Sequence, residues 1–301
     1  MSPNPTQTIS MTGGRGRLAS LVSDHFRAPA YKVKPYSRTA GPGFISLDSL
    51  LQPAVLANAG TIFHLAWSSL PATSEQHPGI EQTHDLPFLD LLLTALATNA
   101  DTKRTRLVFF STGGAVYGNA PGRANQEGDT CQPIGAYGRF KLAAEQLINE
   151  RAQRDGLLCT VLRISNPYGY PVPPSRAQGL IPHALRCSVN NQPLNLWGDG
   201  STRKDFLYYT DFLSALEHML AANLSGTYNL CAGHSHQISE VIKLVETEAG
   251  HPITLVPTPA PAWDVHDSRL SNEKFCRATG WQPQVDLAEG IRRSAAGYLQ
   301  H

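Results

Sequence analysis

A tyrosine and a lysine, Tyr137 and Lys141, stand four residues apart in a stretch with helical spacing. On a helix, residues four apart lie on the same face, so their side chains can interact. An ordinary tyrosine has a pKa of about 10 and is a poor base at neutral pH, but a neighbouring ammonium group favours the phenolate. The pair is therefore a candidate for general-base chemistry on a hydroxyl group. The alternative is an ordinary amphipathic pair, because this spacing is common by chance.

Two hydroxyl side chains, Ser111 and Thr112, directly follow the apolar run at 107–110. We expect that run to be a buried strand, with both hydroxyls at its carboxyl end. A hydroxyl group in this place can hydrogen-bond the oxygen that undergoes oxidation and align it with the tyrosine. Both residues are therefore candidate catalytic residues beside Tyr137 and Lys141.

Three glycines between residues 13 and 16 separate a predicted strand at 8–11 from a predicted helix at 18–26. Glycine permits a tight turn and lets the backbone approach a pyrophosphate at the N-terminus of a helix, where amide donors converge. Ala19 completes a GxxGxxA pattern and is small enough for close packing of the helix on the strand. A plain turn is the alternative, but a position at the first strand-to-helix junction favours phosphate binding.

The elements that must position these residues alternate along the first 165 residues, where short apolar runs separate stretches of helical periodicity. This alternation predicts crossover units and an α/β fold, a doubly wound parallel sheet with helices on both faces. Such sheets bind ligands at the carboxyl ends of their strands. We expect strands at 8–11, 31–36, 44–47, 61–65, 107–110 and 158–164, and helices at 18–26, 86–96 and 137–148.

The composition of the sequence changes at Asn166, after which prolines are more frequent and more loops are expected. Further strands are expected at 206–209 and 227–230, on either side of a helix at 211–222. We therefore predict a dinucleotide-binding domain at residues 1–165, with later strands near 205–232 interleaved, and a smaller lobe that takes up most of residues 166–301.

The composition excludes several classes of protein. The chain has 301 residues, 41% of them hydrophobic and 16% charged, which is not the composition of a disordered protein. Its net charge of +1 gives no overall electrostatic reason to bind nucleic acid or an anionic membrane. The five cysteines are far apart, the histidines have no metal-ligand spacing, and no signal peptide or membrane-spanning run is present. We expect a soluble, cytoplasmic protein without a metal site.

Six motifs in a fixed order identify a family. They are the glycine turn, STGGAVYG at 111–118, YGRFK at 137–141, RISNPYG at 163–169, WGDGSTRKDF at 197–206 and GTYNLCAG at 226–233. Over nearly its whole length, the chain resembles the extended short-chain dehydrogenase/reductase family, in its nucleotide-sugar epimerase/dehydratase branch. The resemblance implies a Rossmann domain that binds NAD or NADP and a smaller C-terminal α/β lobe that binds a nucleoside-diphosphate sugar. It also implies a homodimer through the helices at 86–96 and 137–148.

The resemblance also implies roles for individual residues. Tyr137 is the expected base, and Lys141 is expected to hold the nicotinamide ribose and to lower the pKa of the tyrosine. The remaining cofactor contacts that it implies are Gly13, Gly16, Arg17 and Leu18 at the diphosphate, Asp48 at the adenine, and Leu65, Ala66 and Ser111 around the cofactor. For the sugar nucleotide it implies Asn166 at the diphosphate, Leu180 near the base, the Arg203-Lys204 pair as a clamp on the diphosphate, and Thr112 beside the sugar.

The chain departs from the family pattern at three of these places. Gly113 stands where the hydroxyl residue beside the tyrosine is usual, so Thr112 is the nearest substitute and Ser111 the next. Lys204 replaces an arginine, and a lysine offers a point charge rather than a two-pronged donor, so Arg203 is expected to take over the clamp. Thr83 replaces an asparagine near the start of a helix.

The end of the second predicted strand leaves the choice of cofactor open. NAD sites usually have an acidic residue there, which accepts a hydrogen bond from the ribose 2′-hydroxyl. This strand ends in Ser37-Arg38, which would accommodate a 2′-phosphate, and Arg15 and Arg17 add positive charge nearby. The alternative is that Arg38 stacks on the adenine or faces solvent. The sequence is therefore compatible with either NAD or NADP as the cofactor.

The function that these motifs predict is a 4-epimerase for a UDP-hexose or a UDP-N-acetylhexosamine, working through a transient 4-keto sugar. Dehydration is disfavoured because the stretch 113–115 has no carboxylate that could protonate a leaving hydroxyl. One alternative is an NADPH-dependent reductase of 4-keto-6-deoxy nucleotide sugars, and another is a cofactor sensor without catalysis. Trp197 is a candidate to pack on the nucleoside base, or else belongs to the core of the smaller lobe.

Overall fold

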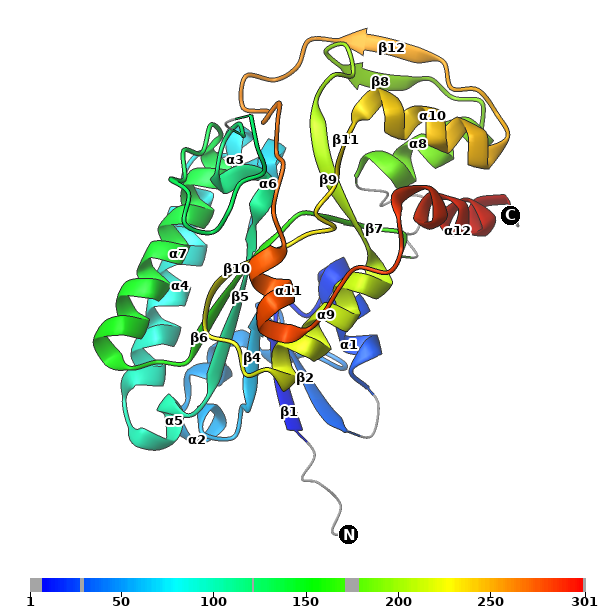
Figure 1. Ribbon diagram of the computed structural model, residues 1–301. Coiled ribbons are helices and arrows are strands. Elements are labelled where there is room, and N and C mark those ends of the chain that lie inside the picture. The colour runs from blue at the N-terminus through cyan, green and yellow to red at the C-terminus, as the bar shows by residue number, and fades with distance from the viewer. Residues whose placement is uncertain (1–6, 28–29, 121, 171–178, 300–301) are drawn as a thin grey trace. The chain divides into compact units, whose positions relative to one another are not determined.

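The computed structural model describes residues 7–27, 30–120, 122–170 and 179–299 (Figure 1). The chain divides into two compact units. The first unit consists of Met1–Ser111, Ala136–Leu162 and Leu224–Thr227, and the second of Thr112–Gly135, Arg163–Asn223 and Tyr228–His301.

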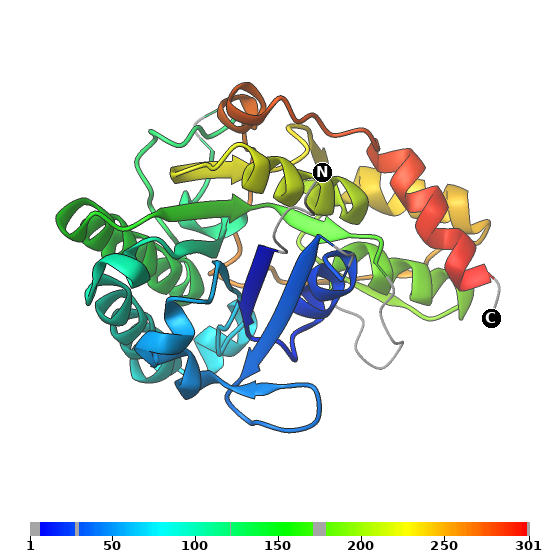
Figure 2. The same ribbon diagram turned by 90° about the horizontal axis from the view of Figure 1, so that it is seen from below.

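A seven-stranded parallel sheet of Rossmann type confirms the predicted fold class, with the strand order β10-β6-β5-β4-β1-β2-β3. β1 lies between β4 and β2, and its last residue, Thr12, is opposite Tyr36 on β2 and His64 on β4. The blue strands β1 and β2 lie side by side in Figure 2. Because the carboxyl ends of these strands meet at one edge, polar groups that follow them gather there. The strands are β1 (Gln7–Thr12), β2 (Tyr31–Ser37), β3 (Ile45–Ser46), β4 (Thr61–His64), β5 (Arg106–Thr112), β6 (Cys159–Ile164) and β10 (Gly226–Leu230).

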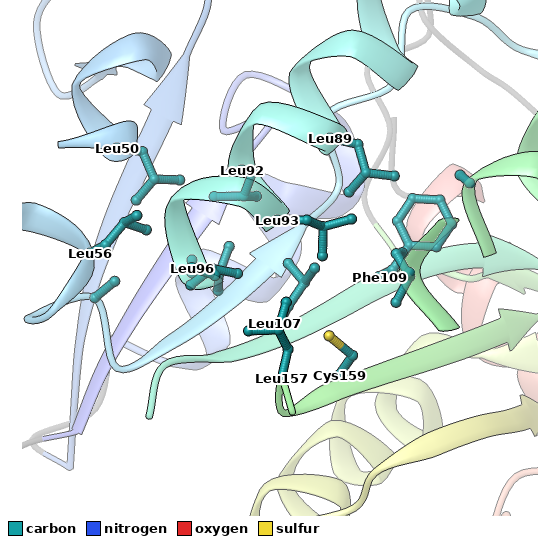
Figure 3. Packing of buried hydrophobic residues seen from close by; sticks show 14 of the residues in the cluster. Leu50, Leu56, Leu89, Leu92, Leu93, Leu96, Leu107, Phe109, Leu157 and Cys159 are labelled. Carbon is teal, nitrogen blue, oxygen red and sulfur yellow. The ribbon is translucent and has the colours of Figure 1, made fainter. Parts of the chain in front are cut away.

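Two long helices of the first unit, α4 and α7, pack side by side in Figure 1. One face of α4 is apolar and fully buried. Its leucines, Leu89, Leu92, Leu93 and Leu96, belong to one buried cluster with Leu107 and Phe109 of β5 (Figure 3). Burial of each such side chain contributes about 1.5–3 kcal/mol to folding, so this contact fixes α4 on the sheet. The helices of the unit are α1 (Arg17–His25), the 3-10 helix η1 (Leu47–Leu51), α2 (Pro53–Leu56), α3 (Pro71–Gln76), α4 (Ile80–Ala97), α5 (Ala100–Lys103) and α7 (Ala136–Asp155).

Several elements differ from the expected boundaries, and the helix expected at 137–148 continues to Asp155. The helix expected at 86–96 begins at Ile80, because its first turns bury the polar residues Glu81 and Asp85, which give no apolar periodicity. The strand expected at 44–47 is only two residues long, Ile45–Ser46, because a 3-10 helix begins at Leu47. The strand expected at 206–209 covers Arg203–Tyr208, and Tyr209 already belongs to the following helix.

The second unit contains two small sheets, in the orders β11-β9-β7 and β12-β8, with its own apolar core. Asp205 on β9 is fully buried and accepts hydrogen bonds of 2.9 Å from the backbone N–H groups of Ala232 and Gly233. Trp281 is buried against the edge of the Phe275 ring, as a core residue. The elements are α6 (Gly113–Val116), β7 (Asn166–Tyr168), α8 (Leu180–Val189), β8 (Leu194–Trp197), β9 (Arg203–Tyr208), α9 (Tyr209–Ala221), β11 (Ser235–Gln237), α10 (Ile238–Ala249), β12 (Leu255–Thr258), α11 (Glu273–Thr279) and α12 (Leu287–Leu299).

In the part of the chain that the structure describes, no helix combines the length and the apolar character needed to cross a membrane. All five cysteines are free thiols. Within the same described ranges, no three side chains of His, Cys, Asp or Glu come together as metal ligands.

Candidate functional site

A cavity of about 640 Å³ lies in the first unit, among residues that follow β1, β2 and β4 at the carboxyl edge of the sheet. Of the residues predicted for the cofactor, Gly13, Gly16, Arg38, Asp48, Leu65 and Ala66 line it. Arg17 and Leu18, at the start of α1, are not among the described lining residues. Further lining residues, which the sequence did not single out for this site, are Thr39, Leu47, Leu51, His64, Trp67, His84, Asp85, Phe88 and Leu91.

The glycine turn fits tightly against the end of β4. Gly13 has φ of +70°, and a Cβ atom there would come within 2.8 Å of the Ala66 nitrogen, so only glycine is accommodated. The turn is held by a hydrogen bond of 2.7 Å from the Gly16 N–H to the Gly13 carbonyl. Gly16 caps α1 and has no side chain that could accept from the first N–H groups of that helix. The N-terminus of α1 is therefore suited to an anionic group.

The buried imidazole of His64 is hydrogen-bonded next to the glycine turn. Thr12 Oγ1 accepts a hydrogen bond of 3.1 Å from the Ala66 N–H and shares one of 2.8 Å with His64 Nδ1. Burial, with a smaller contribution from the charge of Lys141, lowers the pKa of His64 to about 3. The imidazole is therefore neutral at pH 7 and is a packing residue of the cavity wall.

Tyr137 and Lys141 lie on one face of α7, as their spacing predicted, with Lys141 Nζ 5.9 Å from the centre of the Tyr137 ring. Lys141 is buried, and its Nζ donates a hydrogen bond of 2.8 Å to the Phe110 carbonyl at the end of β5. The same ammonium lies 4.0 Å from the ring centre of Trp67 and 4.7 Å from that of Phe109. Trp67 lines the cavity, so it connects the Tyr137–Lys141 pair to the glycine turn.

Two buried carboxylates of α4 complete this region and were missed in the sequence. Glu81 accepts a hydrogen bond from the Ser69 hydroxyl. Asp85 accepts two from Ser68, of 2.9 Å from its N–H and 2.8 Å from its hydroxyl. The available signal was a pair of acidic residues one helical turn apart, shortly after a strand that ends at the ligand-binding edge.

These carboxylates change the titration expected of Tyr137. Burial first, and then the charges of Glu81 and Asp85, raise the pKa of Tyr137, whereas the neighbouring Lys141 was expected to lower it. Burial also lowers the pKa of Lys141 to about 7, against the opposing effects of Asp85, Glu145 and Glu81. Glu81 and Asp85 belong to another helix, so the spacing of residues along α7 gives no information on their charges.

The two candidate hydroxyls differ in their surroundings. Ser111 is buried and donates to the carboxylate of Glu145, itself buried on α7. Thr112 is half-buried and precedes α6 without a side-chain capping hydrogen bond. Gly113 has no room for a side chain, since a Cβ atom there would lie 2.5 Å from Leu270 Cδ1. The packing of Leu270 therefore accounts for the glycine at this position.

The sugar-nucleotide candidates lie on neighbouring elements of the second unit. Asn166 on β7 donates a hydrogen bond of 2.8 Å to the Asp205 carbonyl on β9. Lys204 forms an ion pair of 3.0 Å with Asp264, whereas Arg203 Nη1 donates to the Ser235 carbonyl at 3.3 Å. Leu180 is the first residue of α8.

Trp197 ends β8 and does not belong to the core of the second unit. Its side chain is 45% exposed. Its ring meets that of Trp263 edge to face, with 5.5 Å between the ring centres.

Residues 9–231 match the model of the NAD dependent epimerase/dehydratase family. A putative UDP-glucose 4-epimerase of Methanocaldococcus jannaschii is 29% identical over 189 residues, which are 62% of this chain and 61% of that protein, less than two thirds of its length.

Two solved structures are similar over the whole fold. The UDP-glucose 4-epimerase of Thermotoga maritima, determined with UDP-glucose, has a TM-score of 0.85 and 25% identity over 98% of this chain and 99% of that one. The UDP-glucose 4-epimerase of Thermus thermophilus, in complex with NAD, has a TM-score of 0.85 and 27% identity over 97% and 99% of the two chains.

Proposed function

Since the chain belongs to the NAD dependent epimerase/dehydratase family, we propose that it is a nucleotide-sugar 4-epimerase acting on a UDP-hexose or a UDP-N-acetylhexosamine. The observation that carries the proposal is the Tyr137–Lys141 pair on α7, joined through Trp67 to the wall of the glycine-turn cavity. The likeness to two UDP-glucose 4-epimerases supports the substrate class.

The residues of the cavity fit a dinucleotide. The backbone at Gly13 leaves a space that a Cβ atom would fill, and the N-terminus of α1 has no side-chain cap. Both features suit a diphosphate. When NAD is bound, its nicotinamide supplies a hydride acceptor and a positive charge. We assign Gly13, Gly16, Arg17 and Leu18 to the diphosphate, Asp48 to the adenine, Leu65, Ala66 and Ser111 to the surrounding wall, and Lys141 to the nicotinamide ribose.

In this proposal, Tyr137 takes the proton of the C4 hydroxyl of the sugar and later returns it. Because its pKa is raised in the structure, the positive charge of Lys141 is needed to stabilise the phenolate. Thr112 is the hydroxyl that orients the sugar oxygen, since the Ser111 hydroxyl is already engaged by Glu145.

We assign residues 1–165, with the interleaved strand β10, to cofactor binding, and most of residues 166–301 to the nucleotide sugar. Arg203 is the proposed clamp on the sugar-nucleotide diphosphate, because the ammonium of Lys204 is paired with Asp264. Asn166 and Leu180 are assigned to the same ligand, and Trp197 to its base, on account of its exposed ring.

We also propose a homodimer through α4 and α7. These helices pack together, with Arg151 of α7 paired to Asp90 of α4 at 3.3 Å. Light scattering of the purified protein tests the proposal, and a monomer at micromolar concentration would contradict it.

The activity is tested by incubating the protein, as purified, with UDP-glucose, UDP-galactose and their N-acetylated forms, without added cofactor. The proposal expects the C4 epimer of at least one of them, and no epimer with Tyr137→Phe. A strict requirement for stoichiometric NADPH, with a 4-keto sugar nucleotide as substrate, would instead identify a reductase. Cofactor binding without any turnover would identify a sensor.

A further inference from the structure

We propose that two buried carboxylates of α4, Glu81 and Asp85, make the cofactor site favour oxidised NAD over its reduced form. The inference rests on the proposed function, which brings the nicotinamide ring to the Tyr137–Lys141 pair, and it adds the residues that set the redox balance of the bound cofactor. The oxidised ring is a cation and the reduced ring is neutral, so fixed negative charge near the ring stabilises the oxidised form.

Asp85 forms part of the cofactor cavity and is held in one orientation. It is buried and lines the cavity. Its Oδ2 accepts a hydrogen bond of 2.9 Å from the Ser68 N–H, and its Oδ1 accepts one of 2.8 Å from the Ser68 hydroxyl. Because each oxygen has a donor on the same residue, the negative charge is fixed at the cavity wall.

Glu81 lies one helical turn before Asp85 and is fully buried. Its Oε1 accepts a hydrogen bond from the Ser69 hydroxyl, whereas its Oε2 has no hydrogen-bond partner among the residues that the structure describes. A buried carboxylate oxygen without a donor destabilises the folded protein. A cation close to Glu81 would offset this loss.

Both carboxylates lie beside the Tyr137–Lys141 pair. Their donors, Ser68 and Ser69, directly follow Trp67, and Lys141 Nζ lies 4.0 Å from the centre of the Trp67 ring. The helices α4 and α7, which carry the acidic pair and the Tyr137–Lys141 pair, also pack side by side. The acidic pair therefore lies next to the place where Tyr137 and the nicotinamide ring must meet the sugar.

The buried charges of this region are mostly negative. Lys141 supplies one positive charge, but no described lysine, arginine or histidine forms an ion pair with Glu81 or Asp85. Arg38 reaches Asp85 only through the Ser68 hydroxyl, to which its Nη1 donates at 3.1 Å. Burial lowers the pKa of Lys141 to about 7, and the nearby carboxylates oppose this shift, so their charges act on the ammonium. The negative charge stays uncompensated until a cation binds, and the oxidised ring is such a cation.

This preference suits an epimerase, in which the hydride must return to the sugar. Oxidation at C4 transfers a hydride, one proton with two electrons, from the sugar to the ring, and the hydroxyl proton goes to Tyr137. The second half of the reaction reverses both transfers. Because Glu81 and Asp85 favour the oxidised ring, they also favour hydride return to the 4-keto sugar over its release.

The test is calorimetric titration with NAD, NADH and ADP-ribose, which has no nicotinamide. No sugar is present, and nucleotides that co-purify are first identified by mass spectrometry and exchanged. Asp85→Asn keeps the size of the side chain and an acceptor for Ser68 but removes the charge. We expect it to weaken NAD about tenfold relative to NADH and to leave ADP-ribose within about threefold. A tenfold change in this ratio raises the reduction potential of the bound cofactor by about 30 mV.

A second variant and a control assign the effect to buried charge. Glu81→Gln should lower the affinity ratio of NAD to NADH about threefold or more. Asp90→Asn, on the exposed face of the same helix, should leave all three affinities unchanged.

The competing explanation is that Glu81 and Asp85 only hold Ser68 and Ser69 in place. Equal losses for all three ligands would show that structural role, and an unchanged ratio of NAD to NADH in both variants would overturn the proposal. Retained binding of ADP-ribose shows that a variant keeps its fold, and Glu81→Gln decides alone if Asp85→Asn does not fold. Because binding alone is measured, a failed epimerase assay leaves this result unaffected.

Discussion

Lys141 Nζ lies 4.0 Å from the ring centre of Trp67, while it donates a hydrogen bond of 2.8 Å to the Phe110 carbonyl. The ammonium is buried, and burial lowers its pKa to about 7. The face of a tryptophan ring attracts a cation, and the attraction grows where water is excluded. Trp67 is thus a positioning residue that helps Lys141 to keep its charge at neutral pH.

Replacement of Trp67 by leucine should lower the pKa of Lys141 further, because it removes the ring but keeps an apolar side chain over the ammonium. A desolvated cation–π contact is worth about 2 kcal/mol, so the pKa of Lys141 should decrease by about 1.5 pH units. Trp67→Phe should give a smaller decrease. The measurement is an NMR pH titration of the lysine signal that disappears in Lys141→Met. Trp197→Leu, in the second unit, is the control, and an unchanged titration in Trp67→Leu would refute the contact's role.

The buried carboxylates of α4 allow a second prediction, on the pH dependence of activity. Glu81 is one of the charges that raise the pKa of Tyr137, so Glu81→Gln should lower that pKa and increase the phenolate fraction at neutral pH. The ascending limb of the epimerisation rate against pH should then move to lower pH by about one unit.

A matched control for this shift lies on the same helix. Asp90 is exposed and paired with Arg151, so Asp90→Asn should leave the pH profile where it is. A profile that is identical in Glu81→Gln and in the unsubstituted protein would contradict the assignment of Tyr137 as the titrating base.

The sequence predicted the parts of this site that are close together in the chain. The order of strands and helices followed from apolar runs and helical periodicity, and the spacing of Tyr137 and Lys141 placed both on one face of α7. The glycine turn was recognisable because its location between a strand and a helix already requires glycine.

What the sequence could not predict depends on contacts between distant segments. Glu81 and Asp85 affect Tyr137 only because α4 packs beside α7, and neither residue stands near it in the chain. The cause of the glycine at position 113 is Leu270, which approaches it from far along the sequence. Helix periodicity also failed at the start of α4, where polar residues are buried for their hydrogen bonds.

His64 makes the first unit sensitive to acid. Its pKa is lowered from 6.5 to about 3, so the unfolded chain takes up a proton below pH 6.5 that the folded chain does not. The free energy of unfolding should therefore fall by about 1.4 kcal/mol per pH unit from this residue alone, between pH 6.5 and pH 3. His64→Asn, which keeps an acceptor toward Thr12, should lose this slope although it is less stable at pH 7.

Urea denaturation at pH 7, 6 and 5 measures the slope, and the other histidines cancel in the difference between variants. His84→Asn replaces an exposed histidine and should retain the full slope of the unsubstituted protein. Parallel curves for His64→Asn and the unsubstituted protein would show that His64 is not the acid-sensitive group.

The two hydroxyls at the end of β5 should have different roles: Ser111 should contribute to stability and Thr112 to turnover. Ser111→Ala leaves the buried carboxylate of Glu145 without this donor and should cost about 1–3 kcal/mol of unfolding free energy. Thr112→Val keeps the shape of the side chain and should lower kcat about 100-fold with a small effect on stability. Thermal unfolding and epimerisation kinetics of both variants test this assignment. A loss of kcat confined to Ser111→Ala would reverse it.

Gly113 and Leu270 should be energetically coupled. Gly113→Ser would restore a hydroxyl at the position that lacks one, but its Cβ atom would lie 2.5 Å from Leu270 Cδ1. Forcing the extra atoms into this packed contact should cost about 1–3 kcal/mol of unfolding free energy. Leu270→Ala alone should cost about 2–5 kcal/mol, because the leucine is buried. In the double variant the serine occupies part of the space that the leucine vacates, so its loss should be smaller than the sum of the single losses by about 1 kcal/mol or more. A double-mutant cycle measured by urea denaturation tests this, and strictly additive losses would show that Leu270 is not what excludes a side chain from position 113.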